Sequence, residues 1–149
     1  MVDCMAGTVA KASIVINATP ADVWEALTTP DAIKEYMFGT TVVSDWQVGS
    51  PIVWKGEWQG RAYEDKGEIL RFDADRCVSY THYSPLTGAP DVPESYHTVT
   101  VELLPQDGGT RVDLEQDNNA SDDERAHSEA NWKTMLEGLR GYVEGRRQA

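Results

Sequence analysis

Cysteine is scarce in this sequence, which contains only Cys4 and Cys77, far apart and without a C-x-x-C pair. Two isolated cysteines provide no disulfide framework, so we interpret them as reduced thiols of a cytoplasmic protein. Long hydrophobic runs are also absent: no stretch approaches the roughly 20 apolar residues that span a bilayer. The first residues lack the basic segment and apolar run of a signal peptide. We therefore expect neither secretion nor membrane insertion.

Basic residues are few. The chain has 13 lysines and arginines against 25 aspartates and glutamates, which gives a formal charge of -12. The resulting field repels phosphate backbones and anionic lipid surfaces, so we expect no nucleic-acid partner and no peripheral membrane role. An acidic surface most often serves solubility, and it would also attract a basic protein partner.

Catalytic and metal-binding motifs are missing as well. The sequence has no G-x-S-x-G, P-loop, G-x-G-x-x-G or H-E-x-x-H motif. The three histidines, His82, His97 and His127, lack metal-ligand spacing, so we expect neither a metal site nor a cofactor. A glutamate on a predicted strand would be an acid–base candidate only if buried, and we consider Glu57, Glu64 and Glu68.

Length and composition predict one domain over residues 1–149, with an ordered core from about 8 to 145. The N-terminal part begins with a β-branched segment, Thr8–Ile16, that indicates a strand. Two helix starts follow at Thr19–Asp22 and Thr29–Asp31, each with a threonine as N-cap, a proline at the first helical position and an aspartate in the first turn. A strand followed by two short helices is an unusual opening.

The middle of the chain shows strand periodicity interrupted by turn residues. We predict six more strands, at Thr40–Ser44, Pro51–Trp58, Ala62–Phe72, Cys77–Tyr83, Tyr96–Leu104 and Thr110–Gln116. Asp107–Gly109 is a strong hairpin signal. The segment Ser84–Glu94 contains three prolines and a glycine, so it is predicted to be a long loop, of a kind that often forms an entrance flap.

The last part of the chain is predicted to be one long helix, from about Ser121 to Gly145. A capping box at Ser121–Glu124 starts it, and apolar residues then recur at helical spacing. Gly138 and Gly141 each disfavour a helix interior by roughly 1 kcal/mol relative to alanine. We expect that close approach of these glycines to the sheet compensates.

Alternation on the strands predicts which side chains face inward. It places Trp54 and Trp58 on the same face of one strand, and Tyr80 and His82 on the same face of another. Large aromatic residues in such positions usually fill a core, but a long helix held across a curved sheet leaves unfilled space. We therefore predict a ligand pocket with these residues: Trp54, Trp58, Tyr80, His82, Trp132 and Met135.

Four segments of the sequence form a distributed pattern: Ala18–Pro30, Trp54–Trp58, Val78–Pro85 and Asn131–Leu139. They resemble the AHSA1-like family, named after the activator of Hsp90 ATPase homologue, within the SRPBCC or START superfamily of Bet v 1-like proteins. The resemblance covers nearly the whole chain. It implies an α+β helix-grip fold: a curved antiparallel sheet around a long C-terminal helix, with two short helices after the first strand.

Members of this superfamily bind lipids, sterols, polyketides and other apolar molecules, and some are cyclases, dehydratases or hydrolases. Because catalytic residues differ among its branches, the resemblance transfers none to this chain. Our first hypothesis is a binding protein for a small apolar or aromatic ligand. The alternatives are an enzyme in which His82 or a buried glutamate moves a proton, and a module that binds a chaperone or other protein. A homodimer is also possible.

Overall fold

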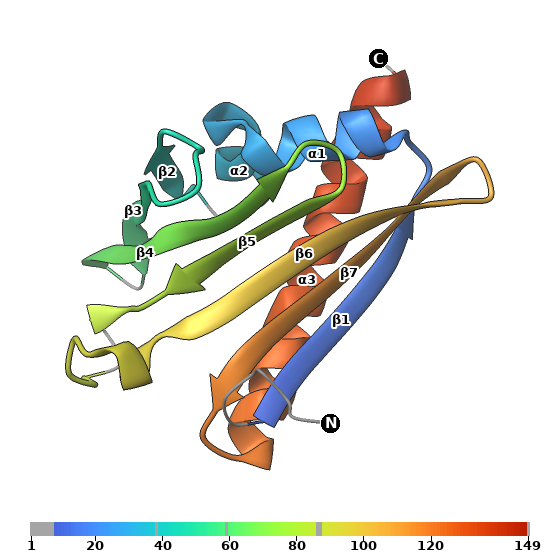
Figure 1. Cartoon of the computed structure of the whole chain (residues 1–149). Helices are drawn as coiled ribbons and strands as arrows, with labels where there is room; N and C mark the ends of the chain where they lie inside the picture. Colours follow the sequence, from blue (N-terminus) through green and yellow to red (C-terminus); the bar gives the residue numbers. More distant parts are fainter. Residues whose placement is uncertain (1–7, 38, 59, 86–87, 149) are drawn as a thin grey trace.

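Seven antiparallel strands form one curved sheet, and a long helix packs across it (Figure 1). The computed structural model describes residues 8–37, 39–58, 60–85 and 88–148, without the side chains of Trp58 and of 146–148. Cys4 lies outside the described residues. The strand order is β1-β7-β6-β5-β4-β3-β2. The strands are β1 (Thr8–Ile16), β2 (Thr41–Ser44), β3 (Pro51–Trp58), β4 (Arg61–Asp73), β5 (Cys77–His82), β6 (His97–Gln106) and β7 (Gly109–Asn119).

The two short helices begin where the threonine-proline pairs predict. In α1 (Pro20–Thr28), the backbone N–H of Asp22 donates to the Thr19 hydroxyl over 3.2 Å, so Thr19 is a true N-cap. In α2 (Pro30–Tyr36), Thr29 occupies the N-cap position but its side chain makes no capping hydrogen bond. Both helices lie near the C-terminal end of the long helix (Figure 1).

The long helix α3 (Asp122–Gln148) starts at the predicted capping box. The N–H of Glu124 donates to the Ser121 hydroxyl over 3.1 Å, and the Glu124 carboxylate accepts from the N–H of Ala120. The expected role of its glycines is wrong. A Cβ on Gly138 would lie 3.4 Å from Tyr36 of α2 rather than against the sheet, and Gly141 has nothing within 4 Å of that position.

The hydrophobic core fills the space between the concave face of the sheet, α1, α2 and α3. The largest fully buried side chains include Ile16, Ile52, Ile69, Leu114, Leu136 and Leu139. Cys77 is buried, as a small apolar residue would be, and the three strand glutamates of the sequence analysis are all exposed. Among the described residues, no helix is long and apolar enough to cross a membrane.

Candidate functional site

A pocket of about 360 Å³ opens between the concave face of the sheet and α3. It is lined by side chains from β3 to β7, from α3 and from the connection between α2 and β2: Met37, Thr40, Trp54, Tyr63, Asp65, Tyr80, His82, His97, Gln116, Ser128, Asn131 and Trp132. Asn131 is exposed, so the pocket reaches the surface beside α3. Its volume is within the roughly 300–1,000 Å³ of small-ligand sites.

Strand register brings the lining residues onto one face. Trp54 of β3 is the direct cross-strand partner of Asp65 in β4, and His82 of β5 is the partner of His97 in β6. The bridge between Lys66 and Tyr83 sets the pairing of β4 with β5. Since neighbours along a strand point to opposite faces, this bridge puts Asp65 and His82 together on the concave face.

Aromatic rings form one wall of the pocket. The ring of Trp54 lies 5.2 Å from the ring of Tyr80 and 5.0 Å from the imidazole of His82, the latter edge to face. Burial raises the pKa of Tyr80, so its hydroxyl stays protonated near neutral pH and remains a hydrogen-bond donor. This wall therefore offers a ligand both apolar surface and one polar contact.

An acidic residue and a histidine are paired at the same wall. Oδ2 of Asp65 lies 2.9 Å from Nε2 of His82. The other carboxylate oxygen, Oδ1, is buried and has no hydrogen-bond partner in the described part of the chain. Buried polar atoms without partners are rare in folded proteins and often belong to functional sites. The protein thus tolerates an unpaired carboxylate oxygen beside the pocket.

The remaining polar groups are held in place by the protein itself. The hydroxyls of Thr40 and Tyr63 lie 2.6 Å apart, and the indole N–H of Trp132 donates to Oε1 of Gln116 over 2.5 Å. Nδ1 of His97 donates to the carbonyl oxygen of Asp117 over 2.9 Å. A neutral His97 with its proton on Nδ1 has a lone pair on Nε2 to accept a hydrogen bond. The pocket therefore has both donors and acceptors.

Four of the six residues predicted to line a pocket do so: Trp54, Tyr80, His82 and Trp132. Met135 is instead packed in the hydrophobic core with 7% of its surface exposed. The side chain of Trp58 lies outside the described part of the structure. Contact of these residues with a ligand stays a prediction.

Sequence reasoning missed the polar lining from β4 and β7, above all Asp65, Tyr63 and Gln116. Alternation of Tyr63 and Asp65 along β4 is a signal, but an aspartate on a strand normally indicates the solvent face. Their positions depend on the pairing with β3 and β5, which no local pattern specifies. No group of histidine, cysteine, aspartate or glutamate side chains among the described residues could hold a metal ion.

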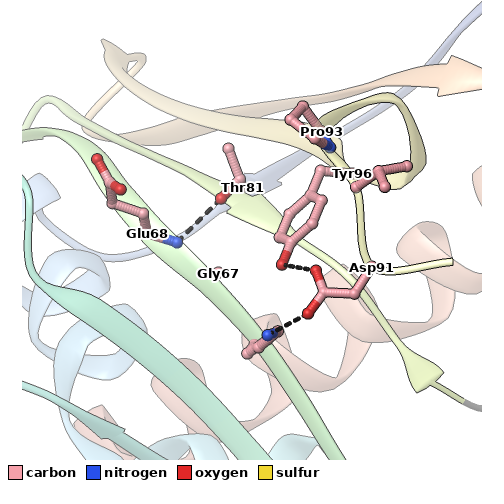
Figure 2. A pocket seen from close by; sticks show the side chains of 8 residues that line it. Gly67, Glu68, Thr81, Asp91, Pro93 and Tyr96 are labelled. Atoms are coloured by element: carbon pink, nitrogen blue, oxygen red, sulfur yellow. Dashed lines mark hydrogen bonds and ion pairs between the residues drawn. The ribbon is translucent and has the colours of Figure 1, made fainter.

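A second groove of about 450 Å³ lies on the opposite face of β4 and β5, against the segment before β6 (Figure 2). The ammonium of Lys66 pairs with Asp91, and the Tyr96 hydroxyl donates to Asp91 Oδ1 over 2.6 Å. The ring of Tyr96 stacks on Tyr83 with centroids 5.2 Å apart. The predicted entrance loop borders this groove, and none of its described residues lines the main pocket.

A long helix across a curved antiparallel sheet, with two short helices after the first strand, is the helix-grip architecture of Bet v 1-like proteins in the SRPBCC superfamily. Within that class, the chain belongs to the Activator of Hsp90 ATPase homolog 1-like family, whose sequence model matches residues 17–144. The resemblance seen in the sequence is thereby confirmed. No curated protein matches the sequence.

Solved structures agree with this assignment. The solution structure of ChR145 from Cytophaga hutchinsonii is 56% identical, covers 97% of this chain and 99% of that chain, and has a TM-score of 0.84. The Aha1 dimer from Colwellia psychrerythraea is 23% identical over 92% of this chain and 96% of that chain, with a TM-score of 0.71. Ara h 8.0201 is 13% identical over 93% and 98%, with a TM-score of 0.72. The last two show the fold alone.

Proposed function

We propose that this protein binds a small molecule with an aromatic or apolar body and at least one polar group, in the pocket between the sheet and α3. One observation carries the proposal: the pocket combines an aromatic wall with the Asp65–His82 pair, whose buried carboxylate oxygen has no partner among the described residues. Folding alone gives no reason to place such a group there, since an unpaired buried acceptor costs roughly 1–3 kcal/mol.

The chemistry of the lining supports this ligand class. Trp54, Tyr80 and Trp132 would bury apolar ligand area, at about 25 cal/mol per Å². The Tyr80 hydroxyl would donate to a ligand oxygen, and Nε2 of His97 would accept from a ligand hydroxyl or amine. Apolar walls then supply most of the affinity, and the polar groups select the orientation.

The test is fluorescence titration with N-phenyl-1-naphthylamine, a neutral probe that brightens in apolar sites. We expect saturable binding, weakened at least tenfold by Trp54→Ala. The control is Trp46→Ala, because Trp46 packs on the core beside Phe72 without lining the pocket. Equal effects of the two substitutions, or no saturable binding to the folded wild type, would contradict the proposal.

Native mass spectrometry of gently purified protein would identify the natural ligand. We expect a discrete extra mass that leaves on denaturation and that Trp54→Ala reduces. If the protein keeps its apo mass after incubation with lipid and polyketide mixtures, the protein-partner hypothesis gains weight.

Cytoplasmic location, a homodimer and a basic protein partner stay predictions of the sequence. The homodimer is supported by a structure of the same fold from Colwellia psychrerythraea, which is described as a dimer. Analytical ultracentrifugation at several protein concentrations tests it. A partner attracted by the charge of -12 should be released by salt, because screening shortens the reach of surface charges.

A further inference from the structure

The hydrogen bond between Asp65 and His82 determines where the imidazole can carry its proton. The two side chains are only 15% and 30% exposed, and Oδ2 of Asp65 lies 2.9 Å from Nε2 of His82. An ionised carboxylate accepts hydrogen bonds and donates none, so Nε2 carries the proton. A neutral His82 therefore has its lone pair on Nδ1. No described residue forms a hydrogen bond to this Nδ1, and His82 lines the pocket.

After proton transfer, the imidazolium of His82 would face the carboxylate of Asp65. The negative charge of Asp65 is shared with no other cation or donor among the described residues, since its second oxygen is unpaired. An imidazolium at His82 would form a charge-assisted hydrogen bond to this carboxylate in a partly desolvated site. The other titratable side chains at this end of the pocket are Tyr63, Tyr80 and His97.

A hydrogen-bond donor lies next to this base. Tyr80 and His82 are two residues apart on β5 and share the concave face, roughly 7 Å apart along the strand. Both line the pocket, and burial keeps the Tyr80 hydroxyl protonated, so that it can donate. A proton acceptor and a neutral donor thus flank the same small space.

From this geometry we infer that the protein catalyses proton transfer on an aromatic carbonyl compound, with His82 as general base, Tyr80 as donor to the ligand oxygen and Asp65 as the residue that positions His82. The inference rests on the proposed function, because it needs a ligand in the pocket. His82 Nδ1 takes a proton from the carbon beside the carbonyl, and the C–H electron pair becomes the C=C bond of an enolate. The carbonyl π electrons move to oxygen, where Tyr80 donates.

The imidazolium then returns the proton to the oxygen or to another carbon of the same ligand. The overall reaction is an isomerisation that consumes no co-reactant. A positioned general base typically contributes a factor of 10²–10⁴ in rate. Removing His82 should therefore abolish most of the activity.

The probe is 5-nitrobenzisoxazole, a small aromatic carbon acid. A base removes its C3 proton, the C–H pair completes the nitrile and the N–O bond breaks, which releases a coloured cyanonitrophenolate. We expect saturable turnover above the buffer rate and a loss of at least tenfold in kcat with His82→Gln. The control is His127→Gln, an exposed histidine on α3 outside the pocket, which should leave kcat unchanged.

Asp65 is tested as a positioning residue. Asp65→Asn should lower kcat about tenfold with little change in KM, and Asp65→Glu should recover part of the loss. In ¹⁵N NMR of labelled histidine, wild-type His82 should be the Nε2–H tautomer, and Asp65→Asn should shift it toward a mixture. If Asp65→Asn does not fold, the inference is tested by the tautomer of wild-type His82 and by the kcat of His82→Gln.

The outcomes separate the two proposals. If the probe displaces N-phenyl-1-naphthylamine but reacts at the buffer rate, or if His82→Gln and His127→Gln behave alike, the proton-transfer inference is overturned and ligand binding stands. If neither compound binds the folded protein, both proposals fail. Turnover that depends on His82 and Asp65 supports the inference.

Discussion

Individual side chains of the pocket are fixed by specific hydrogen bonds, and Trp132 is the clearest case. Its indole N–H donates to the amide oxygen of Gln116, a residue with only 9% of its surface exposed. The bond joins α3 to β7 at the edge of the pocket. Because Oε1 of Gln116 accepts this hydrogen bond, the amide nitrogen of Gln116 is oriented away from the indole and can donate to other polar groups.

Trp132→Phe keeps an aromatic ring but removes the donor. We expect it to lower the free energy of unfolding by about 1–3 kcal/mol, because the Gln116 oxygen loses its partner in a buried position. Urea denaturation measures the change. Trp46→Phe makes the same ring reduction at a tryptophan that packs beside Phe72 and whose indole N–H forms no hydrogen bond with the described residues. An equal loss in both variants would show that the Trp132 hydrogen bond contributes nothing.

The Lys66–Asp91–Tyr96 contacts are a second residue-level feature, on the outer face (Figure 2). The hydrogen bond from Lys66, and then that from Tyr96, holds the pKa of Asp91 below its ordinary value of 3.8. Because the pKa of Asp91 is lowered in the folded state, its carboxylate stays ionised and keeps both hydrogen bonds above pH 3.8. Their contribution to stability is lost only as the pH falls through the lowered pKa.

We expect the carboxyl ¹³C signal of Asp91 to titrate with a midpoint below 3.8. Tyr96→Phe removes one of its two donors and should raise the midpoint partway, whereas Lys66→Met should raise it further, since the Lys66 bond is the larger cause. A midpoint at the ordinary value in wild type would show that these contacts do not persist in solution.

At the scale of elements, two of the three glycines of α3, Gly138 and Gly141, lie in different surroundings. Gly141 has open space where a Cβ would lie, but a Cβ on Gly138 would be 3.4 Å from both the Cβ and the carbonyl oxygen of Tyr36. The helix thus approaches α2 closely at Gly138, whereas no packing contact explains why the less helix-favouring glycine occupies position 141.

Gly141→Ala should raise the free energy of unfolding by about 0.8–1 kcal/mol, the difference in helix propensity between the two residues. Gly138→Ala should gain less, because its new methyl group must share space with Tyr36. Chemical denaturation of the two single variants checks the order. A larger gain at Gly138 would contradict the observed approach of α2.

The whole molecule is a sheet that grips a helix, and its pocket exists because the two do not fill all the space between them. A ligand that binds only the folded state stabilises that state by mass action. N-phenyl-1-naphthylamine at a hundred times its Kd should add about 2.7 kcal/mol. For a chain of this size, the thermal midpoint should then rise by roughly 5–10 °C.

Differential scanning calorimetry measures this shift, and Trp54→Ala at the same probe concentration is the matched comparison. The variant should show a much smaller rise, since less of it is ligand-bound. A midpoint that is independent of the probe in the wild type would mean that the probe also binds the unfolded chain or does not bind at all.

Much of the fold was predictable from local signals. β1 and β3 have their predicted bounds, and the other strands differ by one to three residues at their ends. The proline-marked helix starts and the capping box of α3 are where the sequence indicates. These features depend on neighbouring residues alone, so a single sequence is enough to locate them.

The candidate site was predicted only in its apolar part. Trp54, Tyr80, His82 and Trp132 follow the strand and helix periods, and the structure brings them around one pocket. Met135 follows the same helical period but is packed in the core, because periodicity gives the buried side of a helix without saying which of its residues meet a cavity.

By itself, the sequence determined the order of strands and helices, their approximate ends and the family, since these follow from local periodicity, capping residues and a distributed resemblance. Only the tertiary structure decided that Asp65 meets His82. An irregularity between Ile69 and Arg71 lets Ile69 and Phe72, three residues apart on β4, both pack on the core. Strict alternation counted back from Phe72 would turn Asp65 outward, because one inserted residue reverses every face beyond it.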